Sequence, residues 1–210
     1  LASVQVIDMR RELREGNRDI FSRRLVSAMG ECLETGDQII LFVNRRGSAS
    51  HMQCRNCGHS LRCRRCDIAL TYHRDADRLM CHYCGYRRIA PAKCPRCLSY
   101  RMSYYGVGTQ AIVERVGQRF PEATVLRMDS DATKGVRAYE DLFARFSSGE
   151  AQVLVGTQMV AKGLHFPSVS LVGVVSADVG LNIPDYRASE RVFQLLCQVA
   201  GRAGRGRPRS

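Results

Sequence analysis

The sequence predicts an α/β fold, a parallel sheet with helices on its faces, interrupted by a small cysteine-rich module. Apolar runs typical of strands alternate with amphipathic stripes typical of helices, both before and after the module. Between Cys54 and Cys97 this alternation stops, and eight cysteines form four Cys-x-x-Cys pairs. We therefore expect one α/β domain over residues 1–49 and 104–210, with a zinc-binding insertion over residues 50–103.

Before the module, the chain is expected to form a strand, a loop, a helix and a second strand. Apolar residues predict a short strand over Ser3–Met9, and the charged stretch 10–18 predicts a connecting loop. From about Asp19, apolar residues recur at three- and four-residue steps, which predicts an amphipathic helix that ends near Gly36. Ile39–Val43 is a continuous apolar run, and such a run is typical of a buried parallel strand.

After the module the same alternation resumes. One helix is expected to be capped by Thr109 and ended by Pro121, one carries an apolar stripe from Tyr139 to Phe146, and one starts near Arg187. Strands are expected over residues 123–128, 152–156 and 169–175. Because the order of elements is unbroken, we expect the module to join the α/β domain at two nearby points.

The four cysteine pairs predict two zinc sites. Two intervening residues let both sulfurs of a pair point at one ion, and four thiolates complete a tetrahedral site. Only five residues separate the first two pairs, whereas fourteen separate the second pair from the third. Pairs that share an ion are usually about 15–20 residues apart, so we favour a nested arrangement, with a crossed one as the alternative. The inner site would be Cys63, Cys66, Cys81 and Cys84, and the outer site Cys54, Cys57, Cys94 and Cys97.

Two other interpretations of the cysteines are disulfides and an iron–sulfur centre. Disulfides need an oxidising compartment, and no stretch of the chain looks like a signal peptide. Four regular pairs are also more than one iron–sulfur cluster needs. We therefore favour zinc in a structural role, because a site closed by four thiolates has no open position for water. His51, His59, His73 and His82 are expected to be surface or packing residues.

The formal charge of +12 predicts a polyanionic partner such as nucleic acid. Two zinc ions bound by eight thiolates would change this charge to 12 − 8 + 4 = +8, so the basic character would remain. The alternative is a merely well-solvated surface. No apolar run approaches the ~18 residues of a membrane span, so we expect a cytoplasmic protein without a membrane partner. The absence of a starting methionine suggests a fragment of a longer protein.

Two loops that can carry chemistry follow expected strands, at the edge of a parallel sheet where ligands gather. The first is Asn44–Gly47. The second is Gly156–Gly163, whose glycines permit close backbone approach. The hydroxyl of Thr157 in this loop can donate to a phosphate of a nucleic-acid strand.

A third loop, Gln198–Arg205, contains two arginines three residues apart with small residues between them. Arg202 and Arg205 can therefore approach a polyphosphate from one side of a helical turn and neutralise charge that develops on its γ-phosphate. The alternative is a disordered Gly/Arg tail that binds RNA loosely. The helical stripe that leads into the loop favours the first interpretation.

In this order, Leu41–Gly47, Gly156–Gly163 and Gln198–Arg205 resemble motifs IV, V and VI of superfamily 2 helicases. The eight-cysteine insertion after the first motif, followed by the stretch Gly156–Pro167, resembles the primosomal replication-restart DNA helicases. The resemblance covers nearly the whole chain. It implies the second RecA-like lobe of a helicase with a zinc-binding insertion, and it also implies the nested zinc pairing.

The resemblance further implies an activity. Such bacterial helicases unwind DNA 3′→5′ using ATP and Mg²⁺, recognise stalled forks with single-strand/duplex junctions, and reload replication with primosome proteins and single-strand DNA-binding protein. The chain as given has no phosphate loop and no Asp-Glu-x-His magnesium site, so we expect it not to hydrolyse ATP alone. The alternatives are a non-catalytic zinc-ribbon nucleic-acid-binding protein and an RNA helicase of similar lobes.

Individual residues receive roles from the same resemblance. The residues implied at the nucleotide are Gly163, Gln198, Arg202 and Arg205, of which the two arginines would reach the γ-phosphate across the lobe interface. Thr157 would hold a DNA backbone phosphate, and Arg45 and Asp129 are further candidates on the surface that tracks the strand. His165 stands where many relatives carry an acidic residue.

Overall fold

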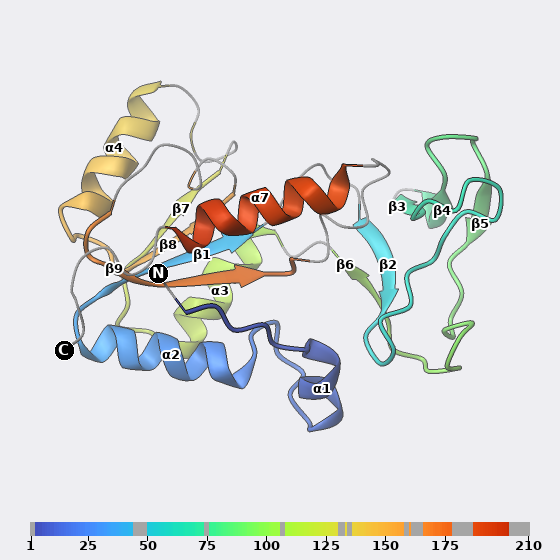
Figure 1. Cartoon of the computed structure of the whole chain (residues 1–210), viewed down its shortest axis with the longest axis horizontal. Helices are drawn as coiled ribbons and strands as arrows, with labels where there is room; N and C mark the ends of the chain where they lie inside the picture. Colours follow the sequence, from blue (N-terminus) through green and yellow to red (C-terminus); the bar gives the residue numbers. More distant parts are fainter. Residues whose placement is uncertain are drawn as a thin grey trace.

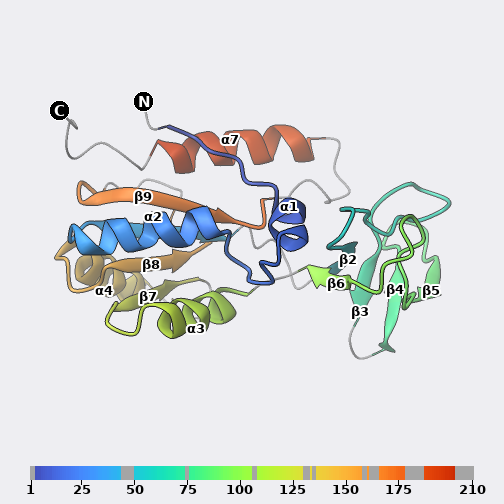
Figure 2. The ribbon, with the colours of Figure 1, turned by 90° about the horizontal axis from the view of Figure 1, so that it is seen from below.

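A computed structural model shows two sheets among the residues that it describes (Figure 1). It describes residues 3–43, 50–73, 76–105, 108–129, 133, 136–157, 160, 166–177 and 187–201, without the side chains of residues 50, 51, 103–105, 136 and 188. A parallel sheet lies between helices, and a smaller antiparallel sheet lies beyond one end of it (Figures 1 and 2). The predicted α/β fold with a small cysteine-rich module is confirmed.

The parallel sheet has four strands in the order β7-β8-β1-β9. Their bounds are Gln38–Val43 for β1, Val125–Met128 for β7, Val153–Gly156 for β8 and Val169–Val175 for β9. β1 lies between β8 and β9, with Ile39 opposite Val153 and Leu41 opposite Gly173. Every residue of β1 is buried, as the continuous apolar run predicts for a central parallel strand.

Helices cover both faces of this sheet. They are α2 (Arg23–Glu34), α3 (Thr109–Arg119), α4 (Val136–Ser147) and α7 (Ala188–Ala200). Ile39, Leu41 and Val43 pack into one core with α2 and α3, whereas Ile40 packs with α4 and Phe42 with α7. This alternation follows from the two-residue period of a strand. Figure 1 shows α2 on one side of the sheet and α4 and α7 on the other.

The N-terminal segment differs from the prediction. Residues 3–8 form no strand, and α1 (Met9–Arg14) occupies part of the stretch expected to be a loop. The Asp8 carboxylate caps this helix by accepting a hydrogen bond from the Arg10 N–H at 2.9 Å. Val4 and Val6 are exposed. Their β propensity predicted a strand, but propensity is realised only where a neighbouring strand and a buried face are present.

The starts of two helices also differ from the prediction. α2 begins later than expected, at Arg23, because Ser22 adopts an extended backbone and caps the helix with its hydroxyl. α3 has Gly108 at its N-cap, so Thr109 is its first helical residue and does not cap it. Thr109 is buried, and its hydroxyl is hydrogen-bonded to the carboxylate of Asp129. A tertiary partner therefore replaces the local cap.

The antiparallel sheet carries the cysteine-rich module, with the strand order β5-β4-β3-β2-β6. The bounds are Ser50–Cys54 for β2, Thr71–His73 for β3, Arg78–Met80 for β4, Arg87–Ile89 for β5 and Met102–Tyr105 for β6. Its buried core consists of Met52, Leu61, Leu70 and Leu79 with two cysteines. So small an apolar core favours stabilisation of the module by metal ions.

The chain enters and leaves the module on neighbouring strands. β2 follows β1, and β6 leads into α3. These two strands pair antiparallel, with Met52 opposite Tyr104. Figure 2 shows both on the side of the module that is nearer the parallel sheet. The pairing brings the two connections together, so the module interrupts the α/β order without separating α3 from the strands it covers.

Candidate metal centres and ligand loops

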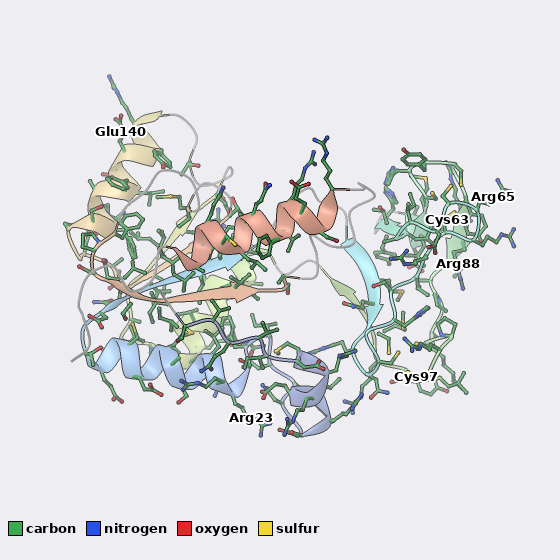
Figure 3. All side chains as sticks on the ribbon, viewed as in Figure 1. Arg23, Cys63, Arg65, Arg88, Cys97 and Glu140 are labelled. Carbon is green, nitrogen blue, oxygen red and sulfur yellow. The ribbon has the colours of Figure 1, made fainter. Side chains whose placement is uncertain are left out.

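Two clusters of four cysteines form in the module, with the nested grouping that the intervals favour. They are Cys54, Cys57, Cys94 and Cys97 (the outer cluster) and Cys63, Cys66, Cys81 and Cys84 (the inner cluster). Within each cluster all four sulfurs lie within 4.8 Å of one another. Figure 3 labels Cys97 and Cys63, which lie in separate parts of the module. The crossed alternative is not found.

The same backbone turn builds all four cysteine pairs. The residue after the second cysteine donates its N–H to the carbonyl oxygen of the first, at 2.8 or 2.9 Å. That residue has a positive φ in every pair: 75° at Gly58, 51° at Asp67, 71° at Gly85 and 59° at Leu98. A positive φ is easiest for glycine, and a short polar residue tolerates it. The backbone of the turn thus explains why two glycines and an aspartate occupy three of these four positions. Leu98 at the fourth position is the exception.

The donor set fits Zn²⁺. Tetrahedral coordination with Zn–S bonds of about 2.3 Å places sulfurs about 3.8 Å apart. The structure has 3.6 Å between the sulfurs of Cys54 and Cys97 and 3.7 Å between those of Cys57 and Cys94. All ten cysteines of the chain are free thiols, so the disulfide interpretation is not supported. A site closed by four thiolates would stabilise the fold and leave no position for a reacting water.

Protonation is uneven within the outer cluster. Burial raises the pKa of the Cys54 thiol to about 12 and also raises the pKa of Cys57. Cys97 differs because the backbone N–H of Ser99 and the side-chain amide of Asn56 donate to its sulfur and lower its pKa to about 6. Without metal, this cluster therefore already contains one thiolate near neutral pH, and Zn²⁺ would displace protons from Cys54 and Cys57.

The inner cluster also contains cysteines with raised and with lowered pKa values. The neighbouring Cys84 sulfur raises the pKa of Cys66 to about 12. Burial acts to raise the pKa of Cys63, but the backbone N–H groups of Arg65 and Cys66 outweigh it and lower the value to about 7. Each cluster thus combines a cysteine of lowered pKa, Cys97 or Cys63, with at least one of raised pKa. A divalent cation that binds all four sulfurs as thiolates would remove this difference.

The histidine side chains that the structure describes near the clusters do not join them. His73 and His82 contact each other, with their Nε2 atoms 3.1 Å apart. Apart from the cysteine clusters, the described residues contain no group of three or more side chains that could hold a metal ion. The side chain of His51 lies outside the described residues. These observations agree with the expected surface or packing roles of His73 and His82.

The loop after β8 begins at the carboxyl edge of the parallel sheet. Gly156 ends the strand, and Thr157 donates its N–H to the carbonyl oxygen of Met128 at 3.4 Å. A Cβ on Gly156 would overlap the Val160 side chain and lie 2.9 Å from that same carbonyl oxygen. The space beside Gly156 is therefore occupied by the chain itself, and close approach of a ligand to this backbone stays a prediction. The side chain of Thr157 is partly exposed.

Asp129 follows β7 at the same edge, but it is only 1% exposed. Its carboxylate accepts from the Thr109 hydroxyl and lies 3.5 Å from Nε of Arg127. Its carbonyl oxygen accepts from the N–H and hydroxyl of Thr133, at 2.9 and 2.6 Å. These contacts assign Asp129 to joining β7 to Thr109 at the start of α3 and to Thr133. A DNA contact by its side chain stays a prediction without exposed surface to support it.

The last expected loop begins at the end of α7. Gln198 is exposed on this helix, whose buried residues Leu195 and Val199 pack on the sheet. The helix ends at Ala200, with Gly201 as its C-cap. The other predicted residues Arg45, Gly163, His165, Arg202 and Arg205 lie outside the described residues, so their roles stay predictions.

One group of polar contacts joins the module to the α/β domain, and sequence reasoning missed it. The side chain of Asp19, 11% exposed, pairs with Arg115 at 3.5 Å and with Arg119 at 3.1 Å on α3. The backbone oxygens of Arg18 and Asp19 accept from the guanidinium of Arg55 at 3.4 and 3.3 Å. Arg55 lies inside the first cysteine pair of the outer cluster. No local motif marks such a contact, because its partners are far apart in sequence.

Comparison with known proteins establishes the family. Residues 102–207, half of the chain, match the family described as the helicase conserved C-terminal domain. The chain belongs to this helicase family. Residues 63–88, which contain the whole inner cluster, match the Cys-rich region (CRR) domain of the PriA DNA helicase. Two different family models thus match the cysteine-rich module and the part of the chain that follows it.

Relatives of this helicase domain carry the name "Replication restart protein PriA". Those of Bacillus subtilis and Synechocystis sp. are each 49% identical over 98% of the chain, which covers 26% and 25% of their lengths. That of Chlamydia pneumoniae is 43% identical over 97% of the chain and 28% of its own length. The chain thus spans about a quarter of the length of these relatives. The resemblance to replication-restart helicases is confirmed.

A solved structure is also similar to this helicase domain. The Hef helicase domain of Pyrococcus furiosus matches 88% of the chain and 24% of its own chain, with a TM-score of 0.39 and 17% identity. None of the described helices is both long and apolar enough to span a membrane.

Proposed function

We propose that the chain is the second lobe, with its zinc-binding insertion, of an ATP-dependent 3′→5′ DNA helicase that recognises stalled replication forks and promotes primosome assembly. One observation carries the proposal. Two cysteine clusters of zinc geometry lie between β1 and α3 of a helicase C-terminal domain. The PriA relatives match this combination over nearly the whole chain.

The proposed division places residues 1–49 and 104–210 in the helicase lobe and residues 50–103 in the insertion. Its support is the separation of the cores. Ile39 and Leu41 belong to the core of the parallel sheet, whereas Leu70 and Leu79 belong to the core of the module. Each cluster in the insertion would hold one Zn²⁺, which would supply structural cross-linking and no catalysis.

In the complete helicase, ATP with Mg²⁺ would bind between this lobe and one that carries a phosphate loop, and would supply the energy for movement. Arg202 and Arg205 would neutralise charge on the γ-phosphate, with Gly163 and Gln198 beside the nucleotide. Support comes from α7, because its packing on the sheet through Leu195 fixes the helix that leads into these arginines.

The strand of DNA would be held along the carboxyl edge of the sheet. Thr157 follows β8 and Arg45 follows β1, and these strands are hydrogen-bonded neighbours. A hydroxyl and a guanidinium are both suited to backbone phosphates. Asp129 is buried behind this edge, where its contact with Thr109 would hold the end of β7 against the start of α3. The basic module would act at the duplex junction and dock primosome proteins and single-strand DNA-binding protein.

Unwinding by a complete protein tests this proposal. The chain, joined to a lobe with a phosphate loop, should separate a duplex that carries a 3′ single-stranded tail and should require ATP. A duplex with a 5′ tail is the matched control and should stay annealed. The chain without the lobe that carries a phosphate loop should separate neither. Equal unwinding of the two substrates, or unwinding without ATP, would show that the proposed activity is wrong.

A further inference from the structure

Leu98 is unusual among the residues that follow the cysteine pairs. It has the same left-handed backbone as Gly58, Asp67 and Gly85, with φ of 59°. A bulky side chain in this conformation has an energetic cost that glycine does not. Leu98 is 70% exposed, so burial within the chain does not offset that cost. Because neither backbone nor core requires leucine here, the side chain suits contact with a partner.

The outer cluster holds this residue in a fixed position. The Leu98 N–H donates to the Cys94 carbonyl oxygen at 2.9 Å, and the Cys94 N–H donates to the Ser99 carbonyl oxygen at 2.8 Å. Tyr100 is also 70% exposed, and Nζ of Lys93 lies 4.7 Å from the centre of its ring. The stretch 93–100 thus presents an apolar side chain, an aromatic ring and a cation from one cross-linked turn.

The charge of the module indicates which kind of partner fits. Residues 50–103 contain 11 Lys and Arg and 3 Asp, a formal charge of 11 − 3 = +8 out of the chain's +12. Eight thiolates and two zinc ions would leave 8 − 8 + 4 = +4. Figure 3 shows Arg65 and Arg88 in the same part of the module as Cys63, apart from Cys97, so the positive charge is spread over the module and is not confined to one cluster. A basic surface with exposed aromatic and leucine side chains is typical of proteins that stack on or insert between bases.

We propose that Leu98 and Tyr100 form a contact for unpaired bases of single-stranded DNA. Tyr100 would stack on one base, Leu98 would pack beside it, and Lys93 would lie near the backbone phosphates. This inference rests on the proposed role of the chain in DNA unwinding and adds the residues by which the module would receive the separated strand. The alternative is that a partner protein docks at the same turn. The following measurements distinguish binding of single-stranded DNA from binding of a protein.

The first measurement is the affinity of the zinc-loaded, full-length chain for a fluorescent oligothymidylate of about 15 nucleotides at fixed salt. Leu98→Gly and Tyr100→Leu should each weaken binding roughly tenfold, because each removes a base contact. Leu98→Gly introduces the residue that two other cysteine pairs already use, so its zinc content should equal that of the parent. Tyr83→Leu is the matched control, because Tyr83 is 77% exposed within a pair of the inner cluster, and it should bind like the parent.

The second measurement uses the absence of tryptophan from the chain. In Tyr100→Trp, the single indole should lose emission when the oligonucleotide stacks on it, whereas the emission of Tyr83→Trp should not change. Unchanged affinity of Leu98→Gly and Tyr100→Leu, or unchanged emission of Tyr100→Trp at saturation, would overturn the inference and favour protein docking. The assay contains neither ATP nor a lobe with a phosphate loop, so its outcome is independent of the unwinding experiment.

Discussion

Gly156 illustrates how single residues shape the carboxyl edge of the parallel sheet. The space that a Cβ would need is filled by Val160 and by the carbonyl oxygen of Met128. The glycine lets the chain turn from β8 directly into the loop that begins at Thr157. Gly156 is therefore closely packed where the strand ends, and the energetic consequence of filling the space can be measured.

Gly156→Ala should lower the free energy of unfolding by about 1–3 kcal/mol, because an added methyl group in a filled space forces its neighbours apart. Urea denaturation of the zinc-loaded chain measures this. Gly117→Ala is the control, since nothing lies within 4 Å of a Cβ there and the residue is inside α3. The control should be stabilised by up to about 1 kcal/mol. Equal stability of Gly156→Ala and the parent would contradict the packing explanation.

The cysteine pKa values predict how zinc binding depends on pH. Zn²⁺ binds thiolates and competes with protons, so its affinity should fall as pH falls. Near neutral pH, Cys54 with a pKa of about 12 must lose its proton on binding, whereas Cys97 with about 6 is already a thiolate. Once pH falls below the Cys97 value, binding should release an additional proton, and Cys63 with about 7 acts in the same direction.

Calorimetric titration of the metal-free chain with Zn²⁺, in two buffers of different ionisation enthalpy, counts these protons. The number released should rise as pH is lowered through the Cys63 and Cys97 values. A number that stays constant over this range would show that the sulfurs do not differ in the way the N–H contacts of Ser99 and Arg65 require.

At the scale of elements, Asp19 connects α3, the start of α2 and the outer cluster. Its carboxylate accepts from the backbone N–H of Ile20 at 2.6 Å in addition to pairing with Arg115 and Arg119. Its carbonyl oxygen accepts from Arg55 in the module. One residue thus links three segments, and removing only its charge tests how much the arginine pairing contributes.

Asp19→Asn should lower the free energy of unfolding by about 1 kcal/mol, because the carboxylate is largely buried while its arginine partners are partly exposed. The asparagine keeps an oxygen that can accept from Ile20. Glu31→Gln is the matched control: Glu31 pairs with Arg24 at 3.4 Å on an exposed surface, and the change should be within about 0.5 kcal/mol. Equal effects in urea denaturation would show that Asp19 has no special role.

The elements also show what could be read from the sequence. Ile39–Val43 predicted β1, and its burial on both faces, because a fully covered strand leaves a continuous apolar run. The spacing of the cysteines favoured the nested clusters because loop length limits which pairs can share an ion. α1 and the Gly108 cap were missed, since Asp8 and Thr109 each fit several local roles and their partners decide between them.

At the scale of the whole molecule, the two sheets differ in what stabilises them. The parallel sheet has cores on both faces, whereas the module has one small core that includes Cys63 and Cys81. A strong chelator should therefore remove the hydrogen-exchange protection of the backbone amides in the antiparallel sheet of the module. The amides of β1 and β8 in the parallel sheet should stay protected. Retained protection in the module after metal removal would contradict a structural role for zinc.

Zinc stoichiometry tests the clusters together. Elemental analysis should find two zinc ions per chain, because two separate sets of four sulfurs are present. Cys54→Ser should leave one ion bound, since the inner cluster shares no ligand with the outer one. Loss of both ions from this variant, at retained solubility, would indicate that the two sites form cooperatively and that the module is a single metal-dependent unit.

The whole-molecule organisation was predictable only in part. The α/β order and the insertion follow from the pattern of apolar residues and cysteines. The contact of Arg55 with Asp19 depends on how two folded parts meet, which no local pattern specifies. The same is true of the buried Gln38, whose side-chain amide donates to the carbonyl oxygens of Phe146 and Ala151 at 2.7 and 2.8 Å.

We propose that this chain forms one lobe of an ATP-driven motor. The most direct test is DNA-stimulated ATP hydrolysis by the chain joined to a lobe that carries a phosphate loop. Arg205→Ala should lower the rate by about 10³-fold, because a guanidinium that neutralises γ-phosphate charge is lost, while affinity for single-stranded DNA stays at the parent value. Hydrolysis by Arg205→Ala at the parent rate would contradict the claim.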